Sequence, residues 1–141
     1  MTYILDSSAI AITIKRLKEK AVKVLDGKKT LDLSHYELGN IIWKECSLRG
    51  QIGREEALCE AEDLAKILKL TDMERIESDE DFRGAMKIAI DLKLTFYDAS
   101  YLQIAKSKSL TLVTEDKELS EKAKKANIKT ITVYDLIHKS P

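Results

Sequence analysis

Hydrophobic positions along this chain fall into two kinds of segment: short apolar runs, and longer stretches in which apolar residues recur every three or four positions. The short runs predict buried strands, because a strand covered on both faces is apolar throughout. The longer stretches predict helices that each bury one face. Strands are expected at residues 2–5, 30–33, 74–76, 110–113 and 129–133, and the third of these has the weakest pattern.

Helices are expected between the strands. The first runs from Ser7 until Gly27 stops it, and Ser34 is expected to cap the next one. Further helices are expected over residues 57–68, over 82–90, from about 97 onward, and over 117–126. The alternation favours an α/β fold with a parallel sheet covered by helices on both faces. Ligands of such sheets bind beyond the carboxyl ends of the strands, so residues there are the first candidates for a functional site.

Length and composition favour one domain over residues 1–141. The chain has 141 residues, 44% of them hydrophobic, which is enough for one buried core. The only proline is Pro141, and no segment has the composition of a linker or a repeat. Basic and acidic residues number 24 each, so the net charge gives no indication of a nucleic-acid partner. The basic stretch at residues 15–29 could follow a nucleic-acid backbone, although a solvated helix face is its commoner meaning.

Location and redox state can also be predicted. No apolar stretch approaches the roughly 18 residues that a membrane span needs, and no basic leader precedes Asp6. We therefore expect a cytoplasmic protein with no membrane contact. Cys46 and Cys59 lack the spacing of a zinc or redox motif, so we expect both to be packed, reduced thiols.

Four acidic residues carry the functional signal: Asp6, Glu37, Asp98 and Asp116. They lie far apart in the sequence, yet each is expected where a strand ends or a helix begins. Those places are neighbours in an alternating α/β fold. Because carboxylates without a counterion repel one another, a cluster of them indicates a divalent cation held by oxygen ligands. Metal-dependent chemistry on phosphate is the resulting hypothesis.

Helix capping is the competing explanation for these acids. Residues 34–37 and 95–98 both match the capping-box pattern, and Asp6 and Asp116 could each cap the helix that follows. Taken singly, each acid is explained at least as well by a cap as by a metal. Asp98 shifts the balance, because it is in line with the apolar positions of its helix and so faces the core. An ionised carboxylate in that position needs a partner.

Each of these acids lies in a short segment of characteristic sequence, at residues 3–8, 36–38, 96–102 and 112–116. Together they resemble the PIN-domain ribonucleases, and among those the small VapC-type toxins of toxin–antitoxin pairs. The resemblance extends over nearly the whole chain. It implies a three-layer α/β/α fold whose parallel five-stranded sheet has the order 3-2-1-4-5. The weak third strand is a departure from the family pattern.

The resemblance also implies roles for individual residues. The acidic quartet would be Asp6, Glu37, Asp98 and Asp116, with Ser7 and Thr114 as the substrate-contacting hydroxyl residues beside it. Asp6, Asp98 and Asp116 would hold Mg²⁺ or Mn²⁺, while Glu37 would orient or deprotonate the nucleophile. Glu118 could stand in for a fifth acid. The implied activity is endoribonuclease cleavage of RNA, and the implied partners are a cognate antitoxin and a second copy of the chain that docks on residues 34–70.

Two other functions stay open: a housekeeping PIN nuclease in RNA processing, and a catalytically silent PIN-like module that binds RNA or protein. A receiver-type signalling domain is disfavoured, because it needs paired acids after the first strand and Asp6 is followed by Ser7 and Ser8. His35 and His138 lack the orienting partner that a catalytic base requires. The aromatic residues near the acids could stack on bases, but core packing is expected for most of Tyr36, Trp43, Phe96 and Tyr97.

Overall fold

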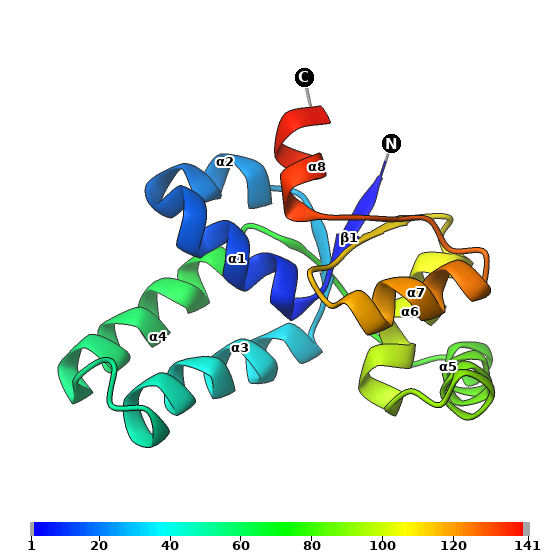
Figure 1. Ribbon diagram of the computed structural model, residues 1–141, viewed down its shortest axis with the longest axis horizontal. Helices are drawn as coiled ribbons and strands as arrows, with labels where there is room; N and C mark the ends of the chain where they lie inside the picture. The colour runs from blue at the N-terminus through cyan, green and yellow to red at the C-terminus, as the bar shows by residue number, and fades with distance from the viewer. Residues whose placement is uncertain (1, 140–141) are drawn as a thin grey trace.

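The computed structural model describes residues 2–139, in which a five-stranded parallel sheet lies between two layers of helices (Figure 1). The strand order is β3-β2-β1-β4-β5, which confirms the order that the resemblance implied. All neighbouring strands pair in parallel. The strands are short: β1 (Tyr3–Leu5), β2 (Lys29–Leu31), β3 (Asp72–Glu74), β4 (Thr111–Val113) and β5 (Thr130–Ile131).

Helical segments fill the connections. They are α1 (Ser7–Leu17), η1 (Lys18–Lys20), α2 (Ala21–Leu25), α3 (Leu33–Trp43), η2 (Lys44–Leu48), α4 (Arg54–Leu68), α5 (Asp79–Leu92), α6 (Phe96–Ser107), α7 (Lys117–Lys125) and α8 (Val133–Lys139). In Figure 1, α1 to α4 lie on one side of β1 and α5 to α7 on the other, with α8 beside the amino-terminal strand.

Alternate residues of each central strand pack into two separate hydrophobic cores, one on each face of the sheet. On β1, Ile4 packs with α5, α6 and α7, whereas Leu5 packs with α1 to α4 and α8. On β4, Leu112 and Val113 divide in the same way. Successive strand side chains point to opposite faces, so a sheet covered on both sides needs apolar residues at every position. This is why the strand sequences are continuous apolar runs.

The first predicted helix is not continuous. Its apolar stripe predicted one helix from Ser7 to Gly27, but helix α1 ends before Lys18, whose backbone has a positive φ of 52°. The Lys18 amide still donates to the Ile14 carbonyl and closes the last turn of α1. Ala21 and Leu25 after the break are both buried in the same core as α1, so the spacing of apolar residues survives although the helix axis changes.

Other boundaries also differ from the prediction. Helix α3 begins at Leu33, so Leu33 is not a strand residue and Ser34 is not the cap. The side chain of Ser34 is instead buried between two other hydroxyl groups. Helix α8 was not predicted at all: the last strand ends at Ile131 and a helix follows.

Several side chains are more exposed than expected. Cys46 and Cys59 carry no disulfide, but Cys46 is half-buried and Cys59 is exposed, so the expectation of packed thiols was wrong. Tyr36, Trp43 and Tyr97 are also exposed, which overturns core packing for three of the four aromatic residues. The fourth, Phe96, stacks on Phe82 with ring centroids 5.6 Å apart. Within residues 2–139, no helix is long and apolar enough to cross a membrane.

Candidate active site at the carboxyl edge of the sheet

The register of the two central strands brings Asp6 and Thr114 together. Leu5 of β1 pairs with Val113 of β4, so the next residue of each strand leaves the sheet at the same carboxyl edge. The Thr114 hydroxyl donates to Oδ2 of Asp6, and the Asp116 amide donates to the Thr114 hydroxyl oxygen at 3.1 Å. Thr114 therefore links the acid after β1 to the acid after β4.

Asp6 is held by three hydrogen bonds and is only 6% exposed. Its Oδ1 accepts from the Ser8 hydroxyl at 2.7 Å and from the Ala9 amide at 2.9 Å, which makes it the N-cap of α1. Its Oδ2 accepts from Thr114. A carboxylate has about four acceptor positions. Three are used here, so one position on Oδ2 is left for a further ligand.

Asp116 is likewise the N-cap of its helix. Its Oδ1 accepts from the Leu119 amide at 3.1 Å, at the start of α7. Among the described residues, no hydrogen bond reaches its Oδ2. The capping explanation is thus correct for Asp6 and Asp116, but in neither residue does the cap use both oxygen atoms. Capping and metal binding are compatible, since the cap orients the carboxylate and leaves an oxygen free.

Glu37 lies at one end of a buried chain of hydroxyl groups. The Tyr101 hydroxyl donates to Oε1 of Glu37 at 3.0 Å and lies 2.7 Å from the Ser34 hydroxyl. Ser34 is 2.6 Å from the Thr30 hydroxyl, and Thr30 donates to the Leu5 carbonyl at 2.7 Å. These hydrogen-bonded hydroxyl groups therefore connect the backbone of strand β1 to the acidic site. Their contacts explain why Ser34 is buried inside α3 rather than capping it.

Ser34 is the branch point of this hydroxyl network. The Thr30 hydroxyl donates to the Leu5 carbonyl and the Tyr101 hydroxyl donates to Glu37, so the Ser34 hydroxyl can donate to either of them. Burial raises the pKa of Glu37, against hydrogen bonds from Tyr101 and Ser7 that lower it.

Asp98 differs from the other acids in having a free carboxylate. The Thr95 hydroxyl accepts from the Asp98 amide at 3.2 Å, so Thr95 is the N-cap of α6 as the 95–98 pattern predicted. The Asp98 carboxylate takes part in none of the side-chain hydrogen bonds of the described chain. Burial, and then the charges of Asp116 and Asp6, raise the pKa of Asp98.

The charges of the four acids act on one another. Burial is the main cause that raises the pKa of Asp6, and the charge of Asp116 adds to it. The charges of Asp98 and Asp6 likewise raise the pKa of Glu37. None of the ion pairs formed within residues 2–139 includes any of the four acids. The cluster thus has an excess of negative charge, for which a divalent cation is the usual partner.

The charge of Lys122 favours ionised Asp98, since it lowers the pKa of that carboxyl. The hydrogen bonds of its Nζ go to other groups: it donates to Oε1 of Glu118 at 2.8 Å and to the Lys93 carbonyl at 3.0 Å. Glu118 itself is exposed and paired with Lys122. This places the possible fifth acid at the rim of the site.

The oxygen donors of the four acids suit a hard divalent cation. Among residues 2–139, no three His, Cys, Asp or Glu side chains are gathered closely enough to hold one ion as they stand. The available donors are nevertheless all carboxylate oxygens, which suit Mg²⁺ or Mn²⁺ rather than zinc or copper. Mg²⁺ usually keeps several waters and needs only one or two direct carboxylates. The oxygens available to such an ion are the remaining acceptor position on Oδ2 of Asp6, the Asp98 carboxylate and Oδ2 of Asp116.

Some residues of the site were not singled out by sequence reasoning. Ser8 donates to Asp6, accepts from the Glu115 amide at 3.1 Å and so joins the loops after β1 and β4. Tyr101 is buried, and the polar end of a buried tyrosine needs a partner, which was the available signal. Asn40 of α3 lies beside Glu37 in a surface pocket, and its sequence context gave no such signal.

Comparison with known proteins agrees with this architecture. Residues 2–125 match the family described as the PIN domain. Exonuclease VapC9 of Pyrobaculum aerophilum is 34% identical over 132 residues, which cover 93% of this chain and 93% of that protein. Ribonuclease VapC3 of the same organism is 32% identical over 127 residues, covering 86% of this chain and 95% of that protein.

Solved structures give the same result. The crystal structure of PAE2754 from Pyrobaculum aerophilum has a TM-score of 0.81 at 32% identity and covers 99% of this chain and 94% of that one. VapBC2 from Rickettsia felis, bound to a DNA fragment from its promoter, has a TM-score of 0.65 at 14% identity, with 94% and 98% covered, and supports the fold alone. The family match and the relatives above 30% identity together show that this chain belongs to the PIN-domain family.

Proposed function

We propose that the chain is a Mg²⁺- or Mn²⁺-dependent endoribonuclease, and that it is the toxin of a VapBC-type toxin–antitoxin pair. The observation that carries the proposal is the group of four coupled carboxylates, which has no ion-pair partner within residues 2–139. Relatives named as VapC nucleases support the same conclusion. A cluster of that charge at the carboxyl edge of a parallel sheet suits a metal-bound phosphodiester.

Each residue has a role in this proposal. Asp6, Asp98 and Asp116 hold the cation, with Asp6 oriented by Ser8 and Thr114. When bound, the cation supplies an acidified water and offsets the charge that develops on the phosphoryl oxygens. Glu37 accepts the proton of the attacking water at the oxygen that Tyr101 does not contact.

The two hydroxyl residues have different roles. Ser7 is half-buried and near enough to Glu37 to lower the pKa of that carboxyl, so it is close enough to the open side to contact substrate. Thr114 is only 2% exposed, and its hydroxyl group is used by Asp6 and Asp116. We therefore assign Thr114 to positioning the acids rather than to the substrate contact expected from the resemblance.

Cleavage of linear and circular single-stranded RNA tests the activity. The relatives are named an exonuclease and a ribonuclease, and a circular substrate separates cutting within a chain from cutting at an end. We expect the purified protein to open the circle in Mg²⁺ or Mn²⁺ and to be silent in EDTA. Cleavage of linear RNA alone would replace the endonuclease by an exonuclease, and cleavage of neither would favour the silent PIN-like module.

The partners form a second part of the proposal. We infer a cognate antitoxin, in a shared cytoplasmic location, whose Arg or Lys side chain enters the acidic cluster, because a guanidinium can replace the charge of the cation. Binding should then compete with Mn²⁺. Coexpression with an adjacent small gene, followed by pull-down, tests this. A protein that copurifies with nothing, and whose expression leaves the host growing normally, would favour the housekeeping nuclease.

A further inference from the structure

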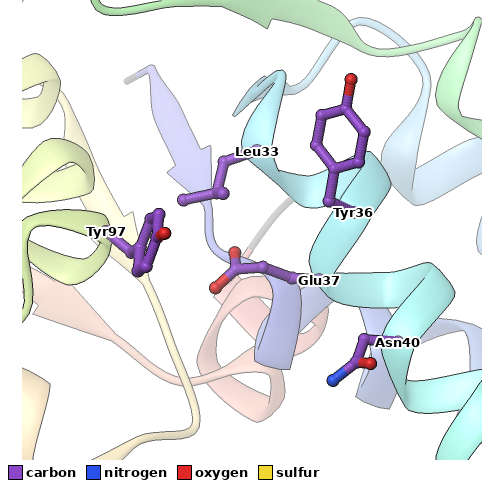
Figure 2. A pocket seen from close by; sticks show the side chains of 5 residues that line it. All are labelled: Leu33, Tyr36, Glu37, Asn40 and Tyr97. Atoms are coloured by element: carbon purple, nitrogen blue, oxygen red, sulfur yellow. The ribbon is translucent and has the colours of Figure 1, made fainter.

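A pocket of about 360 Å³ opens between α3 and α6 beside the acidic site, and Glu37 belongs to both. Its lining is Leu33, Tyr36, Glu37, Asn40 and Tyr97. Figure 2 shows the first four side chains projecting from α3 and Tyr97 lying across from them on α6. Residues 33, 37 and 40 are spaced by four and three positions, which places them on one face of the helix.

The two tyrosines of this pocket are unusually exposed. The exposed fraction is 77% for Tyr36 and 61% for Tyr97, although large aromatic side chains are usually buried for most of their area. Both belong to helices whose opposite faces pack in the core, through Leu38 and Ala99 respectively. Rings held on rigid helices beside a phosphate-binding site are typical platforms for unpaired bases.

The rest of the lining suits a flat ring that has a hydrogen-bonding edge. Leu33 gives an apolar contact, and the Glu37 carboxylate points into the space between α3 and Tyr97 in Figure 2. The Asn40 amide offers a donor and an acceptor side by side, which is the arrangement that matches a base edge. An aliphatic side chain of a protein partner would leave both polar groups unpaired.

The pocket is continuous with the proposed chemistry. Tyr97 directly precedes Asp98, and the charge of Asp98 is felt at Glu37. A nucleotide whose base lies in the pocket would have its phosphate close to the acidic cluster. The pocket therefore lies where the base next to the cleaved bond would be.

We propose that this pocket binds one unpaired nucleobase of single-stranded RNA, stacked on Tyr97, with Tyr36 as the second wall and Asn40 at the base edge. The inference rests on the proposed ribonuclease function and adds a subsite for the base to it. It makes a single-stranded region the required form of the substrate, because a paired base cannot enter.

A double-mutant cycle between protein and RNA tests the subsite. Fluorescence anisotropy measures the affinity of a labelled single-stranded oligoribonucleotide, and of versions with one abasic position each, for the Asp98→Asn protein and for the same protein with Tyr97→Leu. We expect one abasic position and Tyr97→Leu each to weaken binding about tenfold. Combined, they should weaken it no further, since both remove the same contact.

Controls separate stacking from folding. Tyr97→Phe should keep the affinity. Tyr134→Leu removes a tyrosine of matched exposure, 60%, from α8 and should change nothing. Effects of Tyr97→Leu that are absent, or that add independently to those of every abasic position, would overturn the inference. So would a Tyr97→Leu protein that binds RNA normally but loses a copurifying protein, which would identify the pocket as a protein-docking site.

Failure of the base subsite can be distinguished from failure of the proposed ribonuclease function. Cleavage by the unmodified protein reports on the nuclease, whereas the anisotropy cycle reports on the base subsite in a variant that need not cleave. A protein that cleaves RNA but shows no Tyr97 dependence keeps the function and loses the subsite.

Discussion

The Tyr101 hydroxyl donates to Oε1 of Glu37 at 3.0 Å, and through this contact an acid at the open edge of the sheet is connected to the backbone of its central strand. The intervening groups, Ser34 and Thr30, are fully buried. One oxygen of Glu37 is thus fixed by the core, and the other remains for the substrate side. The position of Glu37, the proposed general base, therefore depends on Tyr101, which belongs to a different helix.

Tyr101→Phe removes that contact without removing the ring from the core. The hydrogen bond lowers the pKa of Glu37, so its loss should raise that pKa further and move the acidic limb of the rate profile to higher pH. Stability should fall by about 1 kcal/mol, because Ser34 keeps its Thr30 partner. Rate profiles and denaturant unfolding measure the two effects. Tyr134→Phe is the control, and an acidic limb that stays in place would remove Glu37 from the role of base.

The stability of the metal-free protein should fall as the pH rises above the ordinary carboxyl pKa range of 3.8 to 4.5. The carboxyl pKa values of Asp6, Glu37 and Asp98 are raised from 3.8, 4.5 and 3.8 respectively, so above that range the folded state binds more protons than the unfolded state. Lowered pKa values, such as that of Glu74, act in the opposite direction but mainly at or below 4.5.

Mn²⁺ should reverse this loss, because the cation stabilises the ionised carboxylates. The measurement is the melting temperature at about pH 5 and at neutral pH, in EDTA and in Mn²⁺. We expect a large metal-dependent increase at neutral pH and a small one in acid. A melting temperature in EDTA that rises toward neutrality, with no response to Mn²⁺, would contradict the account of the carboxylate cluster.

Thr114→Val should lower activity through the position of Asp6. The substitution keeps the shape of the side chain but removes the hydroxyl that joins Asp6 to the Asp116 amide. We expect a stability loss of about 1–3 kcal/mol and a fall in kcat of at least about tenfold. Thr13→Val is the matched control, because Thr13 is also buried but donates to the Ala9 carbonyl. Equal losses of activity in both variants would mean that Thr114 has no specific role.

We also expect the protein to form a homodimer through residues 34–70. The exposed apolar side chains of this segment include Trp43 on α3, Leu48 on η2 and Leu58 on α4. Trp43→Glu should turn a dimer into a monomer in sedimentation velocity, since a charge in an apolar interface lacks a partner. Ile90→Glu on α5 is the control, because it changes an exposed apolar side chain elsewhere. A dimer that persists in Trp43→Glu but not in Ile90→Glu would place the interface on α5.

Sequence reasoning recovered the features that depend on local pattern and strand order. The apolar runs around Ile4 and Leu112 located the central strands, and Asp6 follows from the end of the first one. Recognising the acids did not reveal how they are held. The bonds from Thr114 to Asp6 and from Tyr101 to Glu37 join residues 108 and 64 positions apart, and no local rule predicts such contacts.

The missed features have identifiable causes. Lys18 takes a left-handed conformation that usually signals itself through glycine, so the break after α1 was hidden. Ser34 matched a capping pattern, but burial against Thr30 and Tyr101 determined its role instead. Helix α8 does have a signal: Thr132 and Asp135 form a capping box, each side chain bonding the other's amide.

Asp98→Asn isolates metal binding from capping. The Asp98 carboxylate makes none of the side-chain hydrogen bonds in the described chain, whereas Asp6 and Asp116 also cap helices. Replacing Asp98 should therefore maintain or raise metal-free stability, because it removes one of several repelling charges. Asp6→Asn would mix two effects, since its amide nitrogen would face a hydroxyl donor at Ser8 or Thr114.

In the proposed mechanism, these acids hold a divalent cation with which the chain cleaves RNA. The most direct measurement is calorimetric titration of Mn²⁺ into the unmodified protein and into Asp98→Asn, with RNA cleavage followed in the same two preparations. We predict that the unmodified protein binds Mn²⁺ and cleaves RNA until EDTA is added, while Asp98→Asn loses both properties and melts no lower than the parent without metal. Undiminished cleavage in EDTA, or an Asp98→Asn protein that cleaves as well as its parent, would contradict the claim.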